Sequence, residues 1–412
     1  MSENKIKRIE GGVTYPNGFS AAGIHCGLRK NKSKKDLAMI FADVPCSTAA
    51  IYTTNKVYGA PISVTREHLK NGIARAVIAN SGNANTCNPD GIDKANAMCE
   101  AAAKALGIDA SDVVVASTGV IGMPLPLEPI VDGIPNLVAS LGSSPEDGYA
   151  AAAAIMTTDT RLKQIAAETV IGGKTVRIGG MSKGSGMIQP NMATMLSFVT
   201  TDAAIEPAVL QVILKSVADR TFNMISVDGD TSTNDTFCVM ASGKAENERI
   251  TAVDSEDGKA FEELLEYVCR YLARKMAADG EGASKLIECR IRNASNMKDA
   301  RILAKSVINS PLVKTAMYGS DANWGRILCA LGYAGVELDP TKVDVNFISA
   351  AGEINVCRDG GSVGFDEDKA KNILLADSIV IDVDLKAGDV CTVAYGCDLT
   401  YEYVRINGDY RS

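Results

Sequence analysis

The sequence predicts an α/β fold in which sheets and helices form layers. Short apolar runs of strand length alternate with longer stretches of helical spacing, with no linker or low-complexity segment between them. The chain has 412 residues, 46% of them hydrophobic, so it can bury a large core. A chain of this length usually forms more than one domain, and we therefore expect two lobes.

The first third of the chain alternates strands with helices. Residues 37–41, 76–79 and 113–116 are apolar runs typical of buried strands, whereas residues 93–106 and 148–156 are alanine-rich and favour helices. The strand at 113–116 runs directly into Ser117-Thr118-Gly119. Such a corner can aim consecutive backbone N–H groups into a cleft, because glycine permits the dihedral angles that this requires.

The later elements follow the same alternation. Residues 195–199 read as a buried strand, and residues 206–220 as an amphipathic helix with these side chains facing inward: Val209, Leu210, Val212, Ile213 and Val217. A longer helix has its apolar positions at Phe261, Leu264, Leu265, Val268, Leu272 and Met276, and we expect Gly280 to form its left-handed cap. Helices at 296–308 and 324–331 and strands at 285–291, 343–348, 378–383 and 391–395 complete the prediction.

Residues 183–196 have the features of a loop that carries a nucleophile. Lys183 opens a glycine-rich turn, and Ala193 and Thr194 precede the apolar strand. A threonine hydroxyl becomes a useful nucleophile only when a base is held beside it. If the chain is cut between Ala193 and Thr194, the freed α-amine, with a reference pKa of about 7.7–8.0, is such a base. The small Ala193 leaves its carbonyl open, so the same hydroxyl could make the cut by an N-to-O acyl shift.

Histidine and cysteine usage narrows the chemistry. The chain has only His25 and His68, so a Ser-His or Cys-His enzyme would have to use one of them; we expect His68 to be solvated on a charged helix. The 11 cysteines are scattered without a C-x-x-C pair, which predicts mostly buried, reduced thiols in a cytoplasmic protein. A chain so poor in histidine favours another base, such as an N-terminal amine.

Charge, hydrophobicity and motif spacing argue against nucleic acid binding, a membrane span, secretion and a calcium site. The net charge of −8 and the lack of a long basic cluster argue against nucleic acid binding. No apolar stretch reaches the ~18–20 residues that a membrane span needs, and no signal-peptide core follows Met1. Residues 228–235 resemble a calcium loop, but its sixth position is Thr233 and its twelfth is Val239, where glycine and glutamate are required. We therefore predict no metal site and give this loop no chemical role.

Eight blocks together resemble one known family. Besides residues 183–196, these are residues 80–85, 117–122, 157–160, 228–235, 279–283, 319–326 and 406–412, in the same order as in the family. The family is that of the ornithine acetyltransferases, also called glutamate N-acetyltransferases, of arginine biosynthesis. The resemblance implies layered sheets and helices of the self-cleaving ornithine acetyltransferase and aminopeptidase type. It also implies cleavage into chains 1–193 and 194–412.

The same resemblance assigns roles to single residues. It implies that Thr194 is the nucleophile and that Thr118 and Gly119 form the oxyanion hole. It makes Lys183 the partner of a substrate carboxylate and Glu281 the group that meets the substrate amine. The remaining substrate contacts that it implies are Thr157, Asn407 and Ser412, with Thr158 an open alternative to Thr157.

The implied activity is acetyl transfer from N2-acetylornithine to glutamate through acetyl-Thr194. No metal or organic cofactor is implied, and the sequence leaves open whether acetyl-CoA is also a substrate. Family members are heterotetramers of two cleaved pairs, which we expect here too. Two alternatives remain: a self-processing aminopeptidase or amidohydrolase of the related superfamily, and an uncleaved amino-acid-binding protein.

Overall fold

The structure, a computed structural model, describes residues 6–189 and 195–408, which form two compact units. The first unit takes the described residues of Met1–Gly184, Pro190–Asn223 and Thr231–Leu272, and the second takes those of Ser185–Gln189, Met224–Asp230 and Ala273–Ser412. The prediction of an α/β fold with two lobes is confirmed. The units are not the two chains of the predicted cleavage, because residues from both sides of position 193 belong to the first unit.

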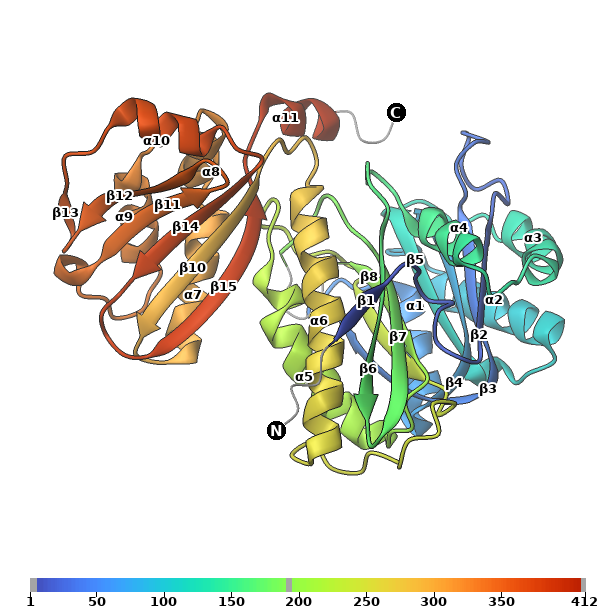
Figure 1. Cartoon of the computed structure of the whole chain (residues 1–412). Coiled ribbons are helices and arrows are strands. Elements are labelled where there is room, and N and C mark those ends of the chain that lie inside the picture. The colour runs from blue at the N-terminus through green and yellow to red at the C-terminus, as the bar shows by residue number, and fades with distance from the viewer. Residues whose placement is uncertain (1–5, 190–194, 409–412) are drawn as a thin grey trace. The chain divides into compact units, whose positions relative to one another are not determined.

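The first unit is built on one large sheet. Within the described residues it has nine strands in the order β1-β6-β7-β8-β9-β3-β4-β5, with β2 paired to β3 (Figure 1). The pairs β4–β5 and β8–β9 are parallel and the others antiparallel. The strands are β1 (Lys7–Ile9), β2 (Phe19–Ile24), β3 (Leu37–Tyr52), β4 (Ile73–Asn83), β5 (Val113–Val120), β6 (Lys163–Ile171), β7 (Lys174–Lys183), β8 (Leu196–Thr201) and β9 (Thr236–Ala241).

The alternation of side chains along β3 explains the layers. Ala38 and Ile40 pack into one core with helix α4 (Pro145–Ile155), whereas Leu37 and Met39 pack into another. This second core includes α1 (Ala60–His68), α2 (Gly91–Leu106) and α3 (Glu128–Ala139). Because successive residues of a strand point to opposite faces, β3 is covered on both sides.

Two further helices correspond to the predicted ones. In α5 (Pro207–Arg220) Leu210, Ile213 and Val217 are buried as predicted, but Val212 is 55% exposed and Leu214 is buried instead. The buried stripe of α5 is therefore rotated from the predicted one. In α6 (Glu256–Ala278) all six predicted core positions are fully buried.

The second unit has its own sheet and core. Its described residues form six strands in the order β13-β12-β11-β14-β10-β15. Helix α7 packs on β10 and β15, and α10 on β11 and β12. The elements are β10 (Leu286–Ala294), α7 (Met297–Asn309), α8 (Pro311–Tyr318), α9 (Trp324–Gly332), β11 (Asp344–Ser349), β12 (Gly352–Arg358), β13 (Gly361–Ser362), α10 (Glu367–Leu374), β14 (Ser378–Asp384), β15 (Val390–Cys397) and α11 (Tyr401–Asn407).

Some local predictions were wrong or incomplete. Gly280 does not have a positive φ; the left-handed glycine after α6 is Gly282, at φ 71°. The hairpin β6–β7 was not predicted, although Gly172 and Gly173, both at positive φ, form its two-residue turn. A Gly-Gly pair between two strand-like runs is the signal that would have found it.

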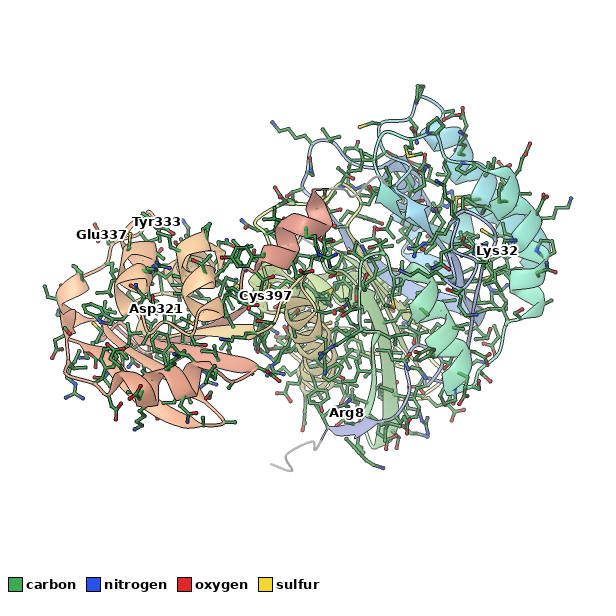
Figure 2. All side chains as sticks on the ribbon, turned by 90° about the horizontal axis from the view of Figure 1, so that it is seen from above. Arg8, Lys32, Asp321, Tyr333, Glu337 and Cys397 are labelled. Carbon is green, nitrogen blue, oxygen red and sulfur yellow. The ribbon has the colours of Figure 1, made fainter. Side chains whose placement is uncertain are left out.

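The cysteines are mostly buried, as predicted. All 11 thiols are free, and those of Cys26, Cys87, Cys329 and Cys391 are the ones not classed as buried. Cys397, labelled in Figure 2, is a buried one that ends β15. No helix in the described part of the chain is long and apolar enough to cross a membrane.

Candidate active site

The predicted cleavage site lies between two neighbouring strands. Ala193 and Thr194 are outside the described residues, as is Ser412. On either side of them, β7 ends at Lys183 and β8 begins at Leu196, and these two residues face each other in the antiparallel ladder. The segment that holds the predicted nucleophile therefore connects adjacent strands of the large sheet.

Thr118 and Gly119 lie at the end of β5, where it leaves the sheet beside β4. Gly119 has a φ of +135°, and a Cβ at this position would lie 2.3 Å from the carbonyl carbon of Gly82 and 2.5 Å from the backbone nitrogen of Asn83. No other residue type fits this backbone without displacing β4. We call Gly82, Asn83, Thr118 and Gly119 the β4–β5 corner.

Lys183 is brought to this corner by β7. Its Nζ donates a hydrogen bond of 3.1 Å to Oγ1 of Thr118. Thr118 is 8% exposed, so the lysine and threonine meet at an almost buried position. Two residues that are 65 positions apart in the sequence, and that the resemblance assigned to different roles, are thus in direct contact.

Asp159 links the backbone of Thr157, a predicted substrate contact, to that of Gly184, the residue after Lys183. Its Oδ2 accepts a hydrogen bond from the backbone N–H of Thr157 at 3.0 Å, and its Oδ1 accepts one from the N–H of Gly184 at 2.8 Å. The buried Nζ of Lys163 lies 2.6 Å from the same Oδ1. Neither Asp159 nor Lys163 has a role predicted from the sequence, yet the aspartate fixes the backbone of both Thr157 and the residue after Lys183.

The charges around Asp159 keep it ionised. Burial alone would raise the pKa of this carboxyl group, but the positive charges of Lys163 and Lys183 and the hydrogen bonds that it accepts lower it to about 2. A fixed anion therefore lies between two lysines in this part of the first unit. Its charge offsets part of the cost of holding Lys163 fully buried.

A second buried carboxyl group precedes β9. Asp235 is 1% exposed, and its Oδ2 has no hydrogen-bond partner among the described residues. Burial raises the pKa of Asp235 well above its ordinary value, opposed by hydrogen bonds from Ser232 and by the charge of Lys183. The raised pKa favours the neutral acid at this position.

Glu281 and Asn407 lie together in the second unit. The Nδ2 of Asn407, at the end of α11, donates to Oε2 of Glu281 at 2.8 Å. The N–H of Glu281 donates to the carbonyl of Ser185, and a Cβ on Gly186 would lie 2.4 Å from the Glu281 carboxyl group. The predicted pair thus meets through a direct hydrogen bond, with the segment after Lys183 packed against it.

Asp228 holds the same segment. Its carboxylate accepts hydrogen bonds from the backbone N–H groups of Met187 and Ile188 at 2.6 and 2.9 Å, and from the hydroxyl of Tyr403 at 3.3 Å. The first residue of the loop at 228–235 therefore has a structural task in the second unit, which the sequence analysis did not identify.

The contacts found for the two histidines are with other residues of the first unit. His68, predicted to be solvated, is half-buried, and its Nδ1 lies 2.8 Å from the carbonyl of Val113. His25 Nδ1 lies 3.1 Å from Asp36. Among the residues that the structure describes, no three His, Cys, Asp or Glu side chains form a group that could hold a metal ion.

Comparison with known proteins extends over nearly the whole chain. The ArgJ family model matches residues 20–412. The arginine biosynthesis bifunctional protein ArgJ of Caldanaerobacter subterraneus subsp. tengcongensis is 50% identical over 405 residues, which cover 98% of this chain and 99% of the relative.

Two solved structures also resemble the chain. The crystal structure of arginine biosynthesis bifunctional protein ArgJ from Bacillus halodurans is 48% identical with a TM-score of 0.50, and covers 52% of this chain and 99% of its own. The ornithine acetyltransferase from Mycobacterium tuberculosis, complexed with ornithine, is 39% identical with a TM-score of 0.42, and covers 46% of this chain and all of its own. The family model and the full-length identity confirm the resemblance seen in the sequence blocks: this chain belongs to the ArgJ family.

Proposed function

We propose that this protein transfers an acetyl group from N2-acetylornithine to glutamate, giving ornithine and N-acetylglutamate. Family membership supports this function, since the relatives are named as bifunctional proteins of arginine biosynthesis. The observation that carries the assignment of the site is the contact of Lys183 with Thr118 at the β4–β5 corner. This contact brings the Lys183 ammonium group, which could pair with a substrate carboxylate, to the predicted oxyanion hole.

The proposal includes cleavage of the chain between Ala193 and Thr194. The resulting chains would have 193 and 219 residues. The comparisons support this division, because the full-length relative matches the whole chain whereas the solved Bacillus halodurans chain accounts for about half of it. The α-amine of Thr194 would then be free to act as the base.

The reaction would proceed in two stages. The Thr194 amine takes the proton from Oγ, and Oγ attacks the acetyl carbonyl of N2-acetylornithine. Donors at Thr118 and Gly119 hold the oxyanion of the tetrahedral intermediate. The intermediate collapses to acetyl-Thr194 as the ornithine nitrogen takes the proton and leaves. Glutamate then attacks the acyl-enzyme through its α-amine, N-acetylglutamate departs, and the Thr194 hydroxyl regains its proton.

The other proposed contacts would set the orientation of the substrate. Lys183 would pair with its α-carboxylate, with Thr157 beside it on the backbone that Asp159 fixes. Glu281, which accepts a hydrogen bond from Asn407, would meet the substrate amine, and we propose Ser412 as a further substrate contact. N2-acetylornithine and glutamate share an α-carboxylate, so the contact with Lys183 can serve both stages.

We also propose that acetyl-CoA is a second acetyl donor. The word bifunctional in the names of the relatives supports this, since one protein is credited with two activities. No cofactor that stays bound is needed for either reaction. We further propose a heterotetramer of two cleaved pairs in the cytoplasm, with a mass in solution of about twice the 43.3 kDa of one chain.

Intact-mass spectrometry under denaturing conditions tests the cleavage. We expect two species, one beginning at Thr194, and a single 412-residue chain in the Thr194→Ala variant. An uncut chain in both proteins would overturn the mechanism.

An ornithine-release assay separates transfer from hydrolysis. We expect sustained release of ornithine from N2-acetylornithine only when glutamate is present, with ping-pong kinetics. Sustained release without glutamate would instead favour the aminopeptidase or amidohydrolase alternative, which no observation in the structure supports over acetyl transfer.

A further inference from the structure

A buried amide links the two strands that form the β4–β5 corner. Asn234, in the loop before β9, is 6% exposed. Its Nδ2 donates to the backbone carbonyl of Ala84 at 2.5 Å and to that of Ser117 at 2.9 Å. Ala84 directly follows β4, and Ser117 directly precedes Thr118 on β5. One side chain thus hydrogen-bonds to the backbone at the end of β4 and to the backbone just before Thr118 on β5.

The orientation of this amide is fixed by its surroundings. Both carbonyls can only accept hydrogen bonds, so the NH₂ group must face them. The Oδ1 atom accepts from the hydroxyls of Thr86 and Thr233, each at 2.6 Å. Thr86 is 1% exposed and Thr233 7%. Both sides of the amide are occupied, so a rotation would leave several buried polar groups unpaired at once.

The β4–β5 corner needs such a support because its own ladder is irregular there. The parallel register between β4 and β5 shifts between Gly82 and Asn83. Among the residues that the structure describes, β5 is the last strand of the sheet and has no strand on its other side. The position of Thr118 and Gly119 relative to β4 is therefore not set by strand pairing alone, and the Asn234 bridge supplies two more fixed points.

We propose that Asn234 is a positioning residue that holds the oxyanion-binding backbone at Thr118 and Gly119 in its working geometry. This inference rests on the proposed function, in which that backbone stabilises the tetrahedral intermediates. Oxyanion stabilisation depends on donor positions within a few tenths of an ångström, and loss of one donor elsewhere lowers the rate by about 10²–10³. In this proposal Asn234 acts through its hydrogen bonds to Ala84 and Ser117, which adjoin the β4–β5 corner, and not through contact with the substrate.

The test compares Asn234→Asp with a matched control, Asn247→Asp. Asn247 is also 6% exposed, and its Nδ2 also donates to two backbone carbonyls, those of Ala204 and Glu248. Both substitutions replace the donating NH₂ with an oxygen and place a carboxyl group against two carbonyls. A general cost of that change should appear in both variants, whereas an effect on the corner should appear in one.

We expect Asn234→Asp to lower kcat by roughly ten- to a hundredfold in both half-reactions, because each passes through an oxyanion at the same place. The KM values for N2-acetylornithine and glutamate should stay within about threefold of the wild type, and kcat is counted per active site from the acetyl-enzyme burst. Asn247→Asp should keep the kcat of the wild type, even though its thermal midpoint should fall by as much as that of Asn234→Asp or by more.

A milder variant covers the case in which Asn234→Asp does not fold. Thr86→Val keeps the side-chain shape and removes one of the two hydroxyls that orient the amide, so we expect kcat to fall by several-fold with an unchanged KM. If the foldable variants at 234 and 86 match Asn247→Asp in kcat while the wild type is active, Asn234 has no positioning role and the proposed function stands. If the wild type transfers no acetyl group, the proposed function and this inference are both wrong.

Discussion

At the scale of single residues, the site depends on backbone positions that few side chains tolerate. Gly119 combines a positive φ with a position so close to β4 that a Cβ on it would clash with the backbone of Gly82. Asp159 is a buried anion that receives two backbone N–H groups and a lysine. Both act by fixing other groups, so their substitution should alter the geometry of the site as well as stability.

Substitution of Gly119 by alanine should abolish most activity. The added methyl group would lie 2.3 Å from the backbone of Gly82, so the corner must open. We expect kcat to fall by about 10² or more, in line with the loss of an oxyanion donor. Gly107→Ala is the control, because Gly107 also has a positive φ, of +69°, but a Cβ there meets nothing within 4 Å. It should cost about 1 kcal/mol of stability and leave kcat unchanged. Equal kcat values in the two variants would contradict the assigned corner.

Substitution of Asp159 by asparagine should raise KM for both amino-acid substrates by at least about tenfold. It would loosen the backbone at Thr157 and Gly184 and leave Lys163 buried without its anion. Asp202→Asn is the control, since Asp202 is fully buried and paired with Arg177 in the same unit. It should lower the thermal midpoint without this change in KM, as measured by steady-state kinetics of both variants.

The lowered pKa of Asp159 also predicts a pH dependence of stability. Its folded pKa of about 2 is below the unfolded reference of about 3.9, so its contribution is present above about pH 4 and is lost as the pH falls toward 2. A shift of this size corresponds to roughly 2–3 kcal/mol. The difference in unfolding free energy between the wild type and Asp159→Asn should therefore shrink below pH 4. A difference that stayed constant from pH 6 to pH 2.5 would show that the carboxylate is not so perturbed.

At the scale of elements, strands from both sides of the predicted cut share one sheet. β7, before the cut, pairs with β8, after it, through six residue pairs from Ile178 and Thr201 to Lys183 and Leu196. β3, also before the cut, pairs with β9 through six more. These backbone hydrogen bonds and the apolar faces around them do not depend on the peptide bond at residue 193.

We therefore expect the two chains to stay together after cleavage. They should elute as one species in native size-exclusion chromatography and separate only in denaturant, where mass spectrometry resolves them. Uncut Thr194→Ala protein, run beside the wild type, should elute at the same volume. Separation of the chains in native buffer would show that the sheet does not hold them.

At the scale of the whole molecule, the proposed base, the α-amine of Thr194, would give the enzyme a characteristic pH profile. The amine must be neutral to take the proton from Oγ, so kcat/KM should rise about tenfold per pH unit on the acid side and level off near or below pH ~8. A stopped assay from pH 5.5 to 9.5 measures this directly. A profile governed by a group of pKa near 4, with a plateau from pH 5, would instead indicate a carboxylate base.

The sequence by itself determined the family and the fold class, and it located many of the helices and strands. Apolar runs and alanine-rich stretches are local patterns, and they located β3, β5, α6 and most of the second unit. The blocks around Thr118, Lys183 and Glu281 are also contiguous, so they could be recognised without any coordinates. The predicted cut at Ala193 and Thr194 lies outside the described residues and stays a prediction.

Only the tertiary structure brought the supporting residues to the site. Asn234 bonds to carbonyls 150 and 117 positions away, and Asp159 bonds to Gly184 at a distance of 25 positions. The burial that raises the pKa of Asp235 likewise comes from packing, which no local pattern records. A hydrogen bond between distant segments leaves no periodicity in either one, because a single polar residue in a loop is compatible with many partners. The sequence therefore predicted which residues do the chemistry, and the fold showed which residues hold the described ones in place.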